Sequence, residues 1–224
     1  IAAGLAHEIR NPLASIRSSV EMLREGPAIS SEDKKLCDIV SREVARLNDL
    51  VSDMVDLSRT REPAVEPVDL ALLAREVVEL AKRSRGAENH RIEYAEDEGA
   101  ERAGTLVASC DPAQMRQVLW NLVRNALQAS PSNGVVRVGV GREGERVALW
   151  VEDDGAGIDD DAKRRIFDAF YTTRAHGAGI GLAVVKRIVD DHAPWGAAIA
   201  VESGEARAGA QAGARFRITL PKAP

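Results

Sequence analysis

The chain has 224 residues, of which 45% are hydrophobic, 29% charged and 4% aromatic, and its formal net charge is −5. At roughly 100–200 residues per domain this length allows one large domain or two small ones, and the composition excludes a mostly disordered chain. The charge excludes a chain-wide basic surface, so no nucleic-acid partner is predicted. Two cysteines are too few for a disulfide framework and predict a reducing, cytoplasmic location.

We identify no stretch near the ~18 apolar residues of a membrane span and no signal peptide. The first residue is Ile1 rather than Met. We therefore expect the chain to be part of a longer protein, with any upstream domain or membrane anchor missing from it.

Residues 1–61 are predicted to form two helices with a short connection. Apolar residues recur at steps of three or four over residues 5–23 and again over residues 36–57, which is the spacing of one helix face. Gly26-Pro27 ends the first helix, and a serine at position 30 or 31 can cap the second. A lone hairpin would expose much of each apolar stripe, so we expect a homodimer that buries them in a four-helix bundle.

Residues 62–67 contain two prolines and are predicted to be a linker. Beyond it we expect helices at 69–84, 112–129, 160–169 and 178–192, and strands at 91–95, 105–109, 134–141, 146–152, 197–202 and 214–220. Asp111-Pro112 is a strong helix start, because it supplies an N-cap and a proline at the first helical position. Strands mixed with helices in this way predict an α+β two-layer sandwich over residues 68–224.

His7 lies on the first predicted helix, about 200° around the axis from Leu5, and so faces away from the apolar stripe. Glu8 can hold one ring nitrogen and leave the other as nucleophile or base. Asn11 lies one turn further on the same face, and Pro12 should bend the helix near His7. Taken alone, an exposed histidine beside a glutamate usually has no catalytic role.

Asn121 and Asn125, with Gln117 one turn earlier, form a polar edge on the predicted helix 112–129. Carboxamide oxygens are hard ligands suited to Mg²⁺, which usually retains several waters and binds phosphate oxygens. An ordinary amphipathic helix with its asparagines in water explains the same pattern.

Two glycine-rich segments lie further along. In Asp153–Gly157, at the end of a strand, glycines permit close approach of a ligand, and the carboxylate can accept from an exocyclic amine such as that of adenine. Gly177–Gly181 opens a helix, whose backbone N–H groups can bind an anion. Between them, Phe167 and Phe170 are predicted to be hinge or core anchors, and Arg174 is either a γ-phosphate contact or a solvated charge. Each segment alone is also typical of simple turns.

The order of these motifs resembles the sensor histidine kinases of two-component systems. The segments that carry the resemblance are His7–Pro12 (H box), Asn121–Asn125 (N box), Asp153–Gly157 (first glycine box), Phe167–Phe170 (F box) and Gly177–Gly181 (second glycine box). Five motifs in this order argue strongly against coincidence. The residues around His7 look most like the nitrogen-regulatory subgroup.

The resemblance implies a dimerisation and histidine-phosphotransfer domain over 1–61 and a Bergerat-type ATP-binding fold over 68–224, with ATP and Mg²⁺ as cofactors. It implies that His7 attacks the γ-phosphate, with Glu8 as orienting partner or base. The phosphoryl group would pass to an aspartate of a response regulator, and Asn11 would orient a water when the family acts as a phosphatase. The sensor domain would lie upstream.

The resemblance also implies a nucleotide site between the asparagine helix and a lid at 159–178. Asn125 would ligate Mg²⁺ with support from Asn121 and Gln117, and Asp153 would accept from the adenine amine. The other positions expected to line ATP are Arg124, Gly155, Gly157, Ile158, Thr173, Arg174, Gly177, Gly179, Gly181 and Leu182.

Three features depart from the family pattern. Gln128 stands where many members have a cation, so Arg124 or Arg174 would have to supply that charge. The turn at 193–198 is longer and bulkier than the usual pair of glycines. Only six residues precede His7, so we expect a shortened and weakened dimer bundle.

Other interpretations predict different chemistry. A gyrase-like, chaperone-like or mismatch-repair ATPase needs the asparagine helix and the glycine boxes but no His-Glu helix. The complete Leu5–Pro12 segment speaks against these ATPases and excludes an anti-sigma serine kinase on the same ground. A degenerate kinase would bind ATP or a partner as a scaffold without transferring phosphate. A purely structural four-helix dimer leaves residues 68–224 unexplained.

Overall fold

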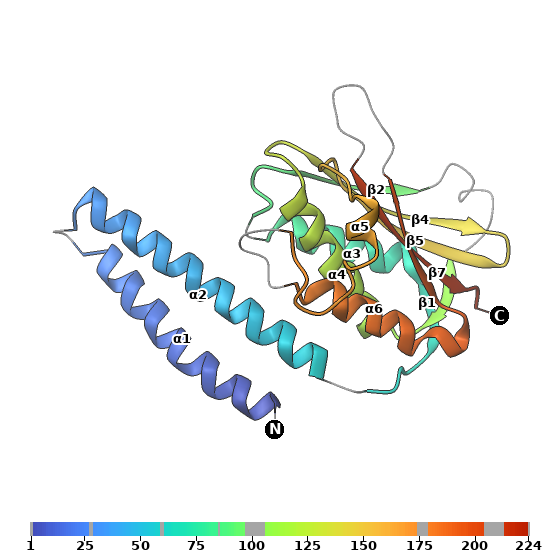
Figure 1. Cartoon of the computed structure of the whole chain (residues 1–224), viewed down its shortest axis with the longest axis horizontal. Helices are drawn as coiled ribbons and strands as arrows, with labels where there is room; N and C mark the ends of the chain where they lie inside the picture. The colour runs from blue at the N-terminus through green and yellow to red at the C-terminus, as the bar shows by residue number, and fades with distance from the viewer. Residues whose placement is uncertain are drawn as a thin grey trace. The chain divides into compact units, whose positions relative to one another are not determined.

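The computed structural model describes residues 2–26, 29–58, 61–84, 86–96, 106–173, 179–203 and 213–223. The chain divides into two compact units, Ile1–Thr60 and Arg61–Pro224. Figure 1 traces both in chain order from blue to red. Within the described ranges, no helix combines the length and apolarity needed to cross a membrane.

The first unit is a hairpin of two antiparallel helices, α1 (Ala2–Arg24) and α2 (Ser31–Ser58). Ser30 caps α2, because its Oγ accepts a 3.0 Å hydrogen bond from the backbone N–H of Asp33. An ion pair of 3.3 Å between Arg24 Nε and Asp38 Oδ1 joins the helices near their connection. At the other end, Arg10 Nη2 donates to Ser52 Oγ at 3.0 Å. The predicted helical hairpin is therefore confirmed.

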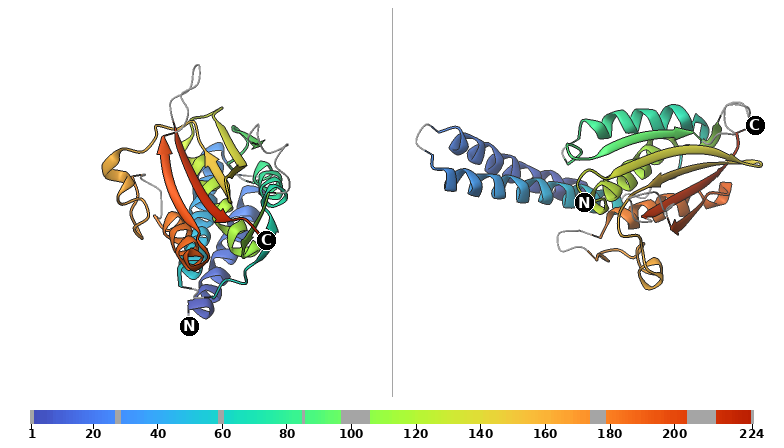
Figure 2. Two further views of the ribbon diagram at one scale, coloured as in Figure 1. Left: turned by 90° about the vertical axis from the view of Figure 1, so that its right-hand side faces the viewer. Right: turned by 90° about the horizontal axis from the view of Figure 1, so that it is seen from above.

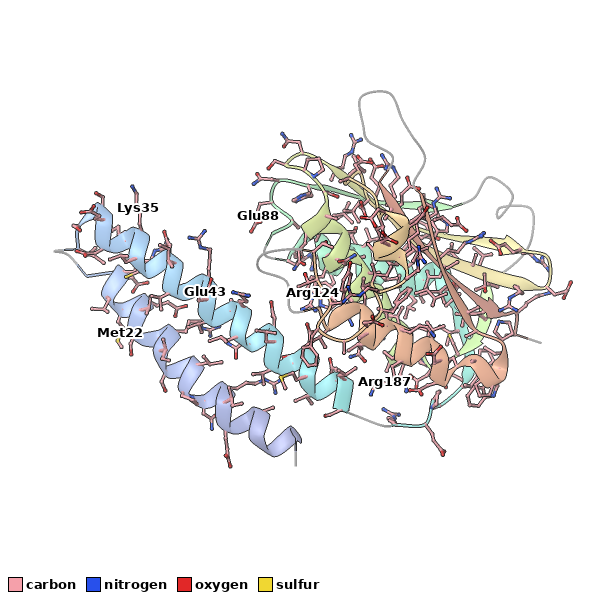
Figure 3. The ribbon with its side chains drawn as sticks, in the orientation of Figure 1. Met22, Lys35, Glu43, Glu88, Arg124 and Arg187 are labelled. Atoms are coloured by element: carbon pink, nitrogen blue, oxygen red, sulfur yellow. The ribbon has the colours of Figure 1, made fainter. Side chains whose placement is uncertain are left out.

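One hairpin covers only part of its apolar surface. Met22, labelled in Figure 3, is 68% exposed. Other large apolar side chains of both helices are also exposed, namely Ile9, Ile16, Leu23, Leu36, Ile39, Val40, Leu47 and Met54.

The second unit contains a five-stranded sheet in the order β2-β4-β5-β7-β6 and a two-stranded sheet of β1 and β3. Its strands are β1 (Glu66–Asp69), β2 (Arg91–Glu96), β3 (Val107–Cys110), β4 (Val135–Glu143), β5 (Arg146–Glu152), β6 (Ala198–Ser203) and β7 (Ala214–Pro221). Its helices are α3 (Leu70–Lys82), α4 (Pro112–Ala129), α5 (Asp160–Lys163), α6 (Gly181–Asp191) and the 3₁₀ helix η2 (Ala193–Trp195). Among the described strands of the five-stranded sheet, only β2 and β4 pair in parallel.

Helices α3, α4 and α6 pack against the five-stranded sheet, as two views of the unit show (Figure 2). Side chains alternate between the two faces of each strand, and those that build the core are at most 2% exposed. They include Val136, Val138, Val140, Leu149, Val151, Phe216, Ile218 and Leu220 from the strands, and Val118, Leu119, Leu122, Val184, Val185 and Ile188 from the helices. The α+β two-layer sandwich predicted from the sequence is confirmed.

Asp111 caps α4 as its sequence predicts. Its Oδ1 accepts hydrogen bonds from the backbone N–H groups of Ala113 and Gln114, at 2.9 and 3.0 Å. Its Oδ2 accepts a third, of 2.9 Å, from Ala64. Burial alone would raise the pKa of Asp111, but the hydrogen bonds from Gln114, Ala64 and Ala113 outweigh it and hold the pKa below its ordinary value. This residue joins the segment before α3 to the helix that carries the asparagines.

The structure corrects two sequence predictions of local structure. Glu66 and Pro67, assigned to the 62–67 linker, begin β1 and pair with Cys110 and Ser109 of β3. Proline is tolerated there because β1 is an edge strand. The helix predicted at 160–169 ends at Lys163. Beyond it, the N–H of Arg165 bonds to Ala162 and that of Asp168 to Arg165, so the chain continues in turns rather than in an α-helix.

The bulky turn at 193–198 forms η2 and closes on Gly196, whose φ of +94° is left-handed. The extra residues are thus accommodated in one short turn at the C-terminal end of α6.

Candidate functional site

The polar edge of α4 faces the beginning of α6. Asn121 is only 6% exposed, so it is not a water-facing residue, whereas Gln117 and Asn125 are half-buried. Arg124 Nη2 lies 3.4 Å from Asn121 Oδ1 and 3.5 Å from the position that a Cβ at Gly181 would occupy. Figure 3 shows Arg124 on α4. Two motifs far apart in the sequence, at 121–125 and at 179–181, are therefore neighbours.

The first turn of α6 is suited to an anion. Its N-cap residue, Ile180, makes no side-chain capping hydrogen bond, so the first backbone N–H groups of the helix rely on other partners. Gly179 precedes it with φ of +66°, and a Cβ there would lie 2.5 Å from the carbonyl oxygen of Tyr171. Arg124 adds a positive charge beside this helix end.

Asp153 follows β5 directly and is 3% exposed. Its Oδ1 accepts hydrogen bonds from the backbone N–H groups of Gly155, at 2.9 Å, and Ala214, at 3.3 Å. Gly155 is required by packing, because a Cβ there would lie 2.7 Å from the carbonyl oxygen of Ala129, the last residue of α4. Gly157 has φ of +76°. The turn thus holds a buried carboxylate in one orientation beside the end of α4.

Gly213 is a site residue that the sequence analysis did not identify. A Cβ at this position would lie 1.7 Å from the carbonyl oxygen of Asp153 and 2.8 Å from its Oδ1. Only glycine allows the start of β7 to approach the aspartate this closely. The signal available in the sequence was a glycine directly before a predicted strand, and it could not be told from its glycine-rich and alanine-rich surroundings.

The two phenylalanines of the aromatic stretch differ. Phe167 packs edge-on against Phe216, with ring centroids 6.5 Å apart, which confirms it as an anchor to the core. Phe170 is 64% exposed, so the core-anchor alternative is wrong for this residue, and its role as a hinge stays a prediction. The physical reason is its left-handed backbone, with φ of +68°, which is held by a hydrogen bond from its N–H to the oxygen of Gly179.

The remaining predicted residues lie at several places. Ile158 and Leu182 are half-buried, while Thr173 and Gln128 are exposed. Arg174 and Gly177 lie outside the described residues. In the first unit, His7 belongs to α1, and Glu8 and Asn11 on the same helix are exposed.

Comparison with known proteins agrees with this geometry. Residues 110–224 match the histidine kinase-, DNA gyrase B- and HSP90-like ATPase family, which defines the class of the second unit. Residues 1–63 match the His Kinase A phospho-acceptor domain, which gyrase-like and chaperone-like ATPases do not require. The chain belongs to the sensor histidine kinases of two-component systems.

Two curated relatives illustrate the similarity. The sensor histidine kinase ZraS of Escherichia coli O157:H7 is 36% identical over 222 residues, which are 99% of this chain and 45% of that protein. The sensory histidine kinase/phosphatase NtrB of Rhodobacter capsulatus is 34% identical over 234 residues, covering 98% of this chain and 61% of NtrB. This match fits the nitrogen-regulatory subgroup. The chain spans about half the length of such relatives.

Solved structures show the same fold. Full-length ShkA in complex with AMPPNP superposes with a TM-score of 0.70 at 28% identity, covering 98% of this chain and 45% of ShkA. Histidine kinase ThkA in complex with the response regulator protein TrrA superposes with a TM-score of 0.67 at 28% identity, covering 99% of this chain and 61% of ThkA.

Proposed function

We propose that this chain uses ATP to phosphorylate its own His7 and then passes the phosphoryl group to an aspartate of a response regulator. The observation that carries the proposal is the approach of Arg124 on α4 to Gly181 of α6, in a chain that also bears a histidine-containing hairpin. Residues 1–61 then serve as the dimerisation and phosphotransfer domain, and residues 68–224 as the ATP-binding domain of a cytoplasmic kinase.

The nucleotide is recognised at two ends. Asp153, fixed by Gly155 and Ala214, accepts a hydrogen bond from the adenine amine. The first N–H groups of α6 bind phosphate oxygens, and Arg124 supplies the cation that Gln128 lacks. Arg174, Gly177 and Thr173 belong to the proposed lid over the phosphates.

The half-buried carboxamide of Asn125 fits a magnesium ligand, with Gln117 and Asn121 as its neighbours on α4. When bound, Mg²⁺ neutralises charge on the phosphate oxygens. Asn121 helps to orient the Arg124 guanidinium, whose Nη2 lies 3.4 Å from Asn121 Oδ1.

In the transfer step, a nitrogen of the His7 ring attacks the γ-phosphorus in line, the bond from that phosphorus to the bridging oxygen breaks, and ADP leaves. Glu8, the next residue, orients the ring or takes its proton. Positioning and charge neutralisation supply most of the rate in such reactions. Asn11, exposed one turn after His7, orients water when the chain acts as a phosphatase. NtrB is named both kinase and phosphatase, which favours this second activity.

The exposed apolar side chains of α1 and α2 support a homodimer, because a four-helix bundle of two hairpins would cover them. Sedimentation analysis is expected to show a dimer, and replacing Met22 and Leu23 by serine is expected to weaken it.

The activity is tested by incubating the chain with γ-labelled ATP and Mg²⁺ beside H7Q and N125A. We expect acid-labile, alkali-stable label on the wild type and none on either variant, while H7Q still binds ATP. Intact ATP binding without label on the wild type would favour a truncated dimer or a scaffold. Adding the upstream helix decides between them, because a chain that still takes no label then contradicts kinase activity.

A further inference from the structure

Three consecutive acidic residues, Glu152, Asp153 and Asp154, end β5 and begin the glycine turn. The side chain of Glu152 is 2% exposed and that of Asp154 13%, and Asp153 is 3% exposed. Burying adjacent like charges is costly unless cations and hydrogen bonds compensate them. The position of Asp153 therefore depends on how its two neighbours are neutralised.

Arg137 of β4 compensates both neighbours. It lies directly opposite Glu152 in the register of β4 and β5, and its side chain is 10% exposed. Arg137 Nη1 is 2.9 Å from Asp154 Oδ1 and 3.5 Å from Glu152 Oε1. The half-exposed Glu93 on β2 is more distant, 4.0 Å from Arg137 Nε.

A second guanidinium holds Glu152 from the other side. Arg215 lies opposite Glu152 in the register of β5 and β7, and its Nε donates to Glu152 Oε2 at 2.7 Å. The Arg215 guanidinium also stacks 4.6 Å from the ring centre of Trp150. Two cations, Arg137 and Arg215, thus neutralise the two carboxylates that flank Asp153.

Asp154 anchors the glycine turn to β4. Its Oδ2 accepts a 3.0 Å hydrogen bond from the backbone N–H of Val135, the first residue of β4. With Arg137 on its other oxygen, the Asp154 side chain fastens the start of the glycine turn to β4. Asp153 is held between this fastened residue and Glu152.

We propose that Arg137 is a positioning residue for nucleotide recognition, acting on Asp153 through Glu152 and Asp154. The proposal rests on the proposed role of Asp153 as the adenine acceptor. Without the Arg137 guanidinium, Asp154 loses the cation on its Oδ1 while Glu152 keeps Arg215, and repulsion between the two carboxylates displaces the turn and the Asp153 carboxylate between them.

Arg217 provides a matched control. It also lies on the sheet and pairs with two carboxylates, those of Glu143 and Glu202. Neither of these flanks Asp153. R217Q therefore removes a similar network without touching the glycine turn.

The test measures the dissociation constant of the full chain for ATP with Mg²⁺, together with its melting temperature. R137Q is expected to raise the dissociation constant about tenfold, comparable to the loss of metal affinity when a residue that orients a metal ligand is replaced. R217Q is expected to stay within about twofold of wild type, because it perturbs only a partly exposed network. At saturating ATP, R137Q should autophosphorylate at the wild-type rate, so that KM rises and kcat does not.

Rescue separates positioning from general stability. R137Q/D154N restores the charge balance, and Asn at 154 retains an oxygen for the Val135 N–H, so its affinity should return to near the wild-type value. An R137Q affinity equal to that of wild type, an equal loss in R217Q, or a failure of the double variant to recover would each overturn the proposal.

Two further variants keep the result interpretable. If R137Q does not fold, R137K takes its place, because lysine keeps the charge but cannot bridge both carboxylates. We expect R137K to bind ATP with an affinity between those of wild type and D153N. A wild-type affinity would overturn the proposal. D153N tests the underlying site. If D153N binds ATP normally, the assignment of Asp153 itself fails, whereas a loss in D153N with normal binding in R137Q refutes only the role of Arg137.

Discussion

The backbone N–H of Asp111 donates a 3.1 Å hydrogen bond to Nε2 of His192. The other ring nitrogen, Nδ1, lies 2.8 Å from the carbonyl oxygen of Ile188, and the residue is 1% exposed. Acceptance at Nε2 and donation from Nδ1 require a neutral ring with its proton on Nδ1. This pair joins the start of α4 to the end of α6, the two helices whose facing edges form the candidate nucleotide site.

Replacing His192 by phenylalanine should destabilise the second unit. The phenyl ring fills similar space but leaves the Asp111 N–H without its buried acceptor, which costs about 1–3 kcal/mol, whereas the Ile188 oxygen still accepts from the backbone N–H of residue 192. Urea unfolding of the full chain measures this loss. H90F is the control, since His90 makes an exposed contact with Gly86, and equal stabilities of the two variants would contradict the prediction.

D111A should cost about 0.5–2 kcal/mol, the usual value of a helix N-cap. The pKa of Asp111 is held below its ordinary value because backbone hydrogen bonds outweigh burial. Its charge therefore contributes stability that is fully present above about pH 4 and is lost as the pH falls through the lower folded pKa. The unfolding free energies of wild type and D111A should be measured across pH 2–7, a range of about five units. The difference between them should narrow only at the acid end. A difference in stability that disappears near neutrality would refute the stabilising role of the Asp111 charge.

G213A should abolish ATP binding with little loss of the hairpin. The added Cβ would lie 1.7 Å from the backbone carbonyl oxygen of Asp153, so the backbone of the glycine turn must move. G144A is a useful control, because Gly144 has a left-handed φ of +60° but open space around its Cβ position. Isothermal titration with ATP and Mg²⁺ should find binding in G144A and none in G213A; retained affinity in G213A would argue against the site.

Cys110 should resist alkylation in the folded chain. Burial, with the negative charges of Asp111 and Glu66, raises the pKa of its thiol to about 12, so little reactive thiolate exists at pH 8. The measurement uses C37S, which leaves Cys110 as the sole thiol, and iodoacetamide with mass detection. Modification is expected only after unfolding in urea, and rapid modification of the native chain would disprove the burial argument.

Local signals in the sequence account for much of the fold. Asp111-Pro112 marks the start of α4 at the correct residue, and the alternating apolar residues of 214–220 mark β7. The order of the histidine, asparagine and glycine motifs identifies the family, because each motif is contiguous in the chain.

Contacts that depend on strand pairing could not be predicted from the sequence. Gly213 meets Asp153, and Arg137 meets Asp154, only because β7 and β4 lie on either side of β5. The core-anchor alternative for Phe170 was wrong because its left-handed backbone, with φ of +68°, has no signature in the sequence. The strand at Glu66 was missed because its pairing partner, Cys110, lies far along the chain.

The position of the phosphoryl group after incubation with ATP and Mg²⁺ tests the central claim most directly. Peptide mapping at neutral pH should place it on His7 alone, in a form that acid removes and alkali does not. A phosphoryl group on a serine, threonine or aspartate, or steady ATP hydrolysis with no phosphorylated chain, would contradict the account of this protein as an autophosphorylating histidine kinase.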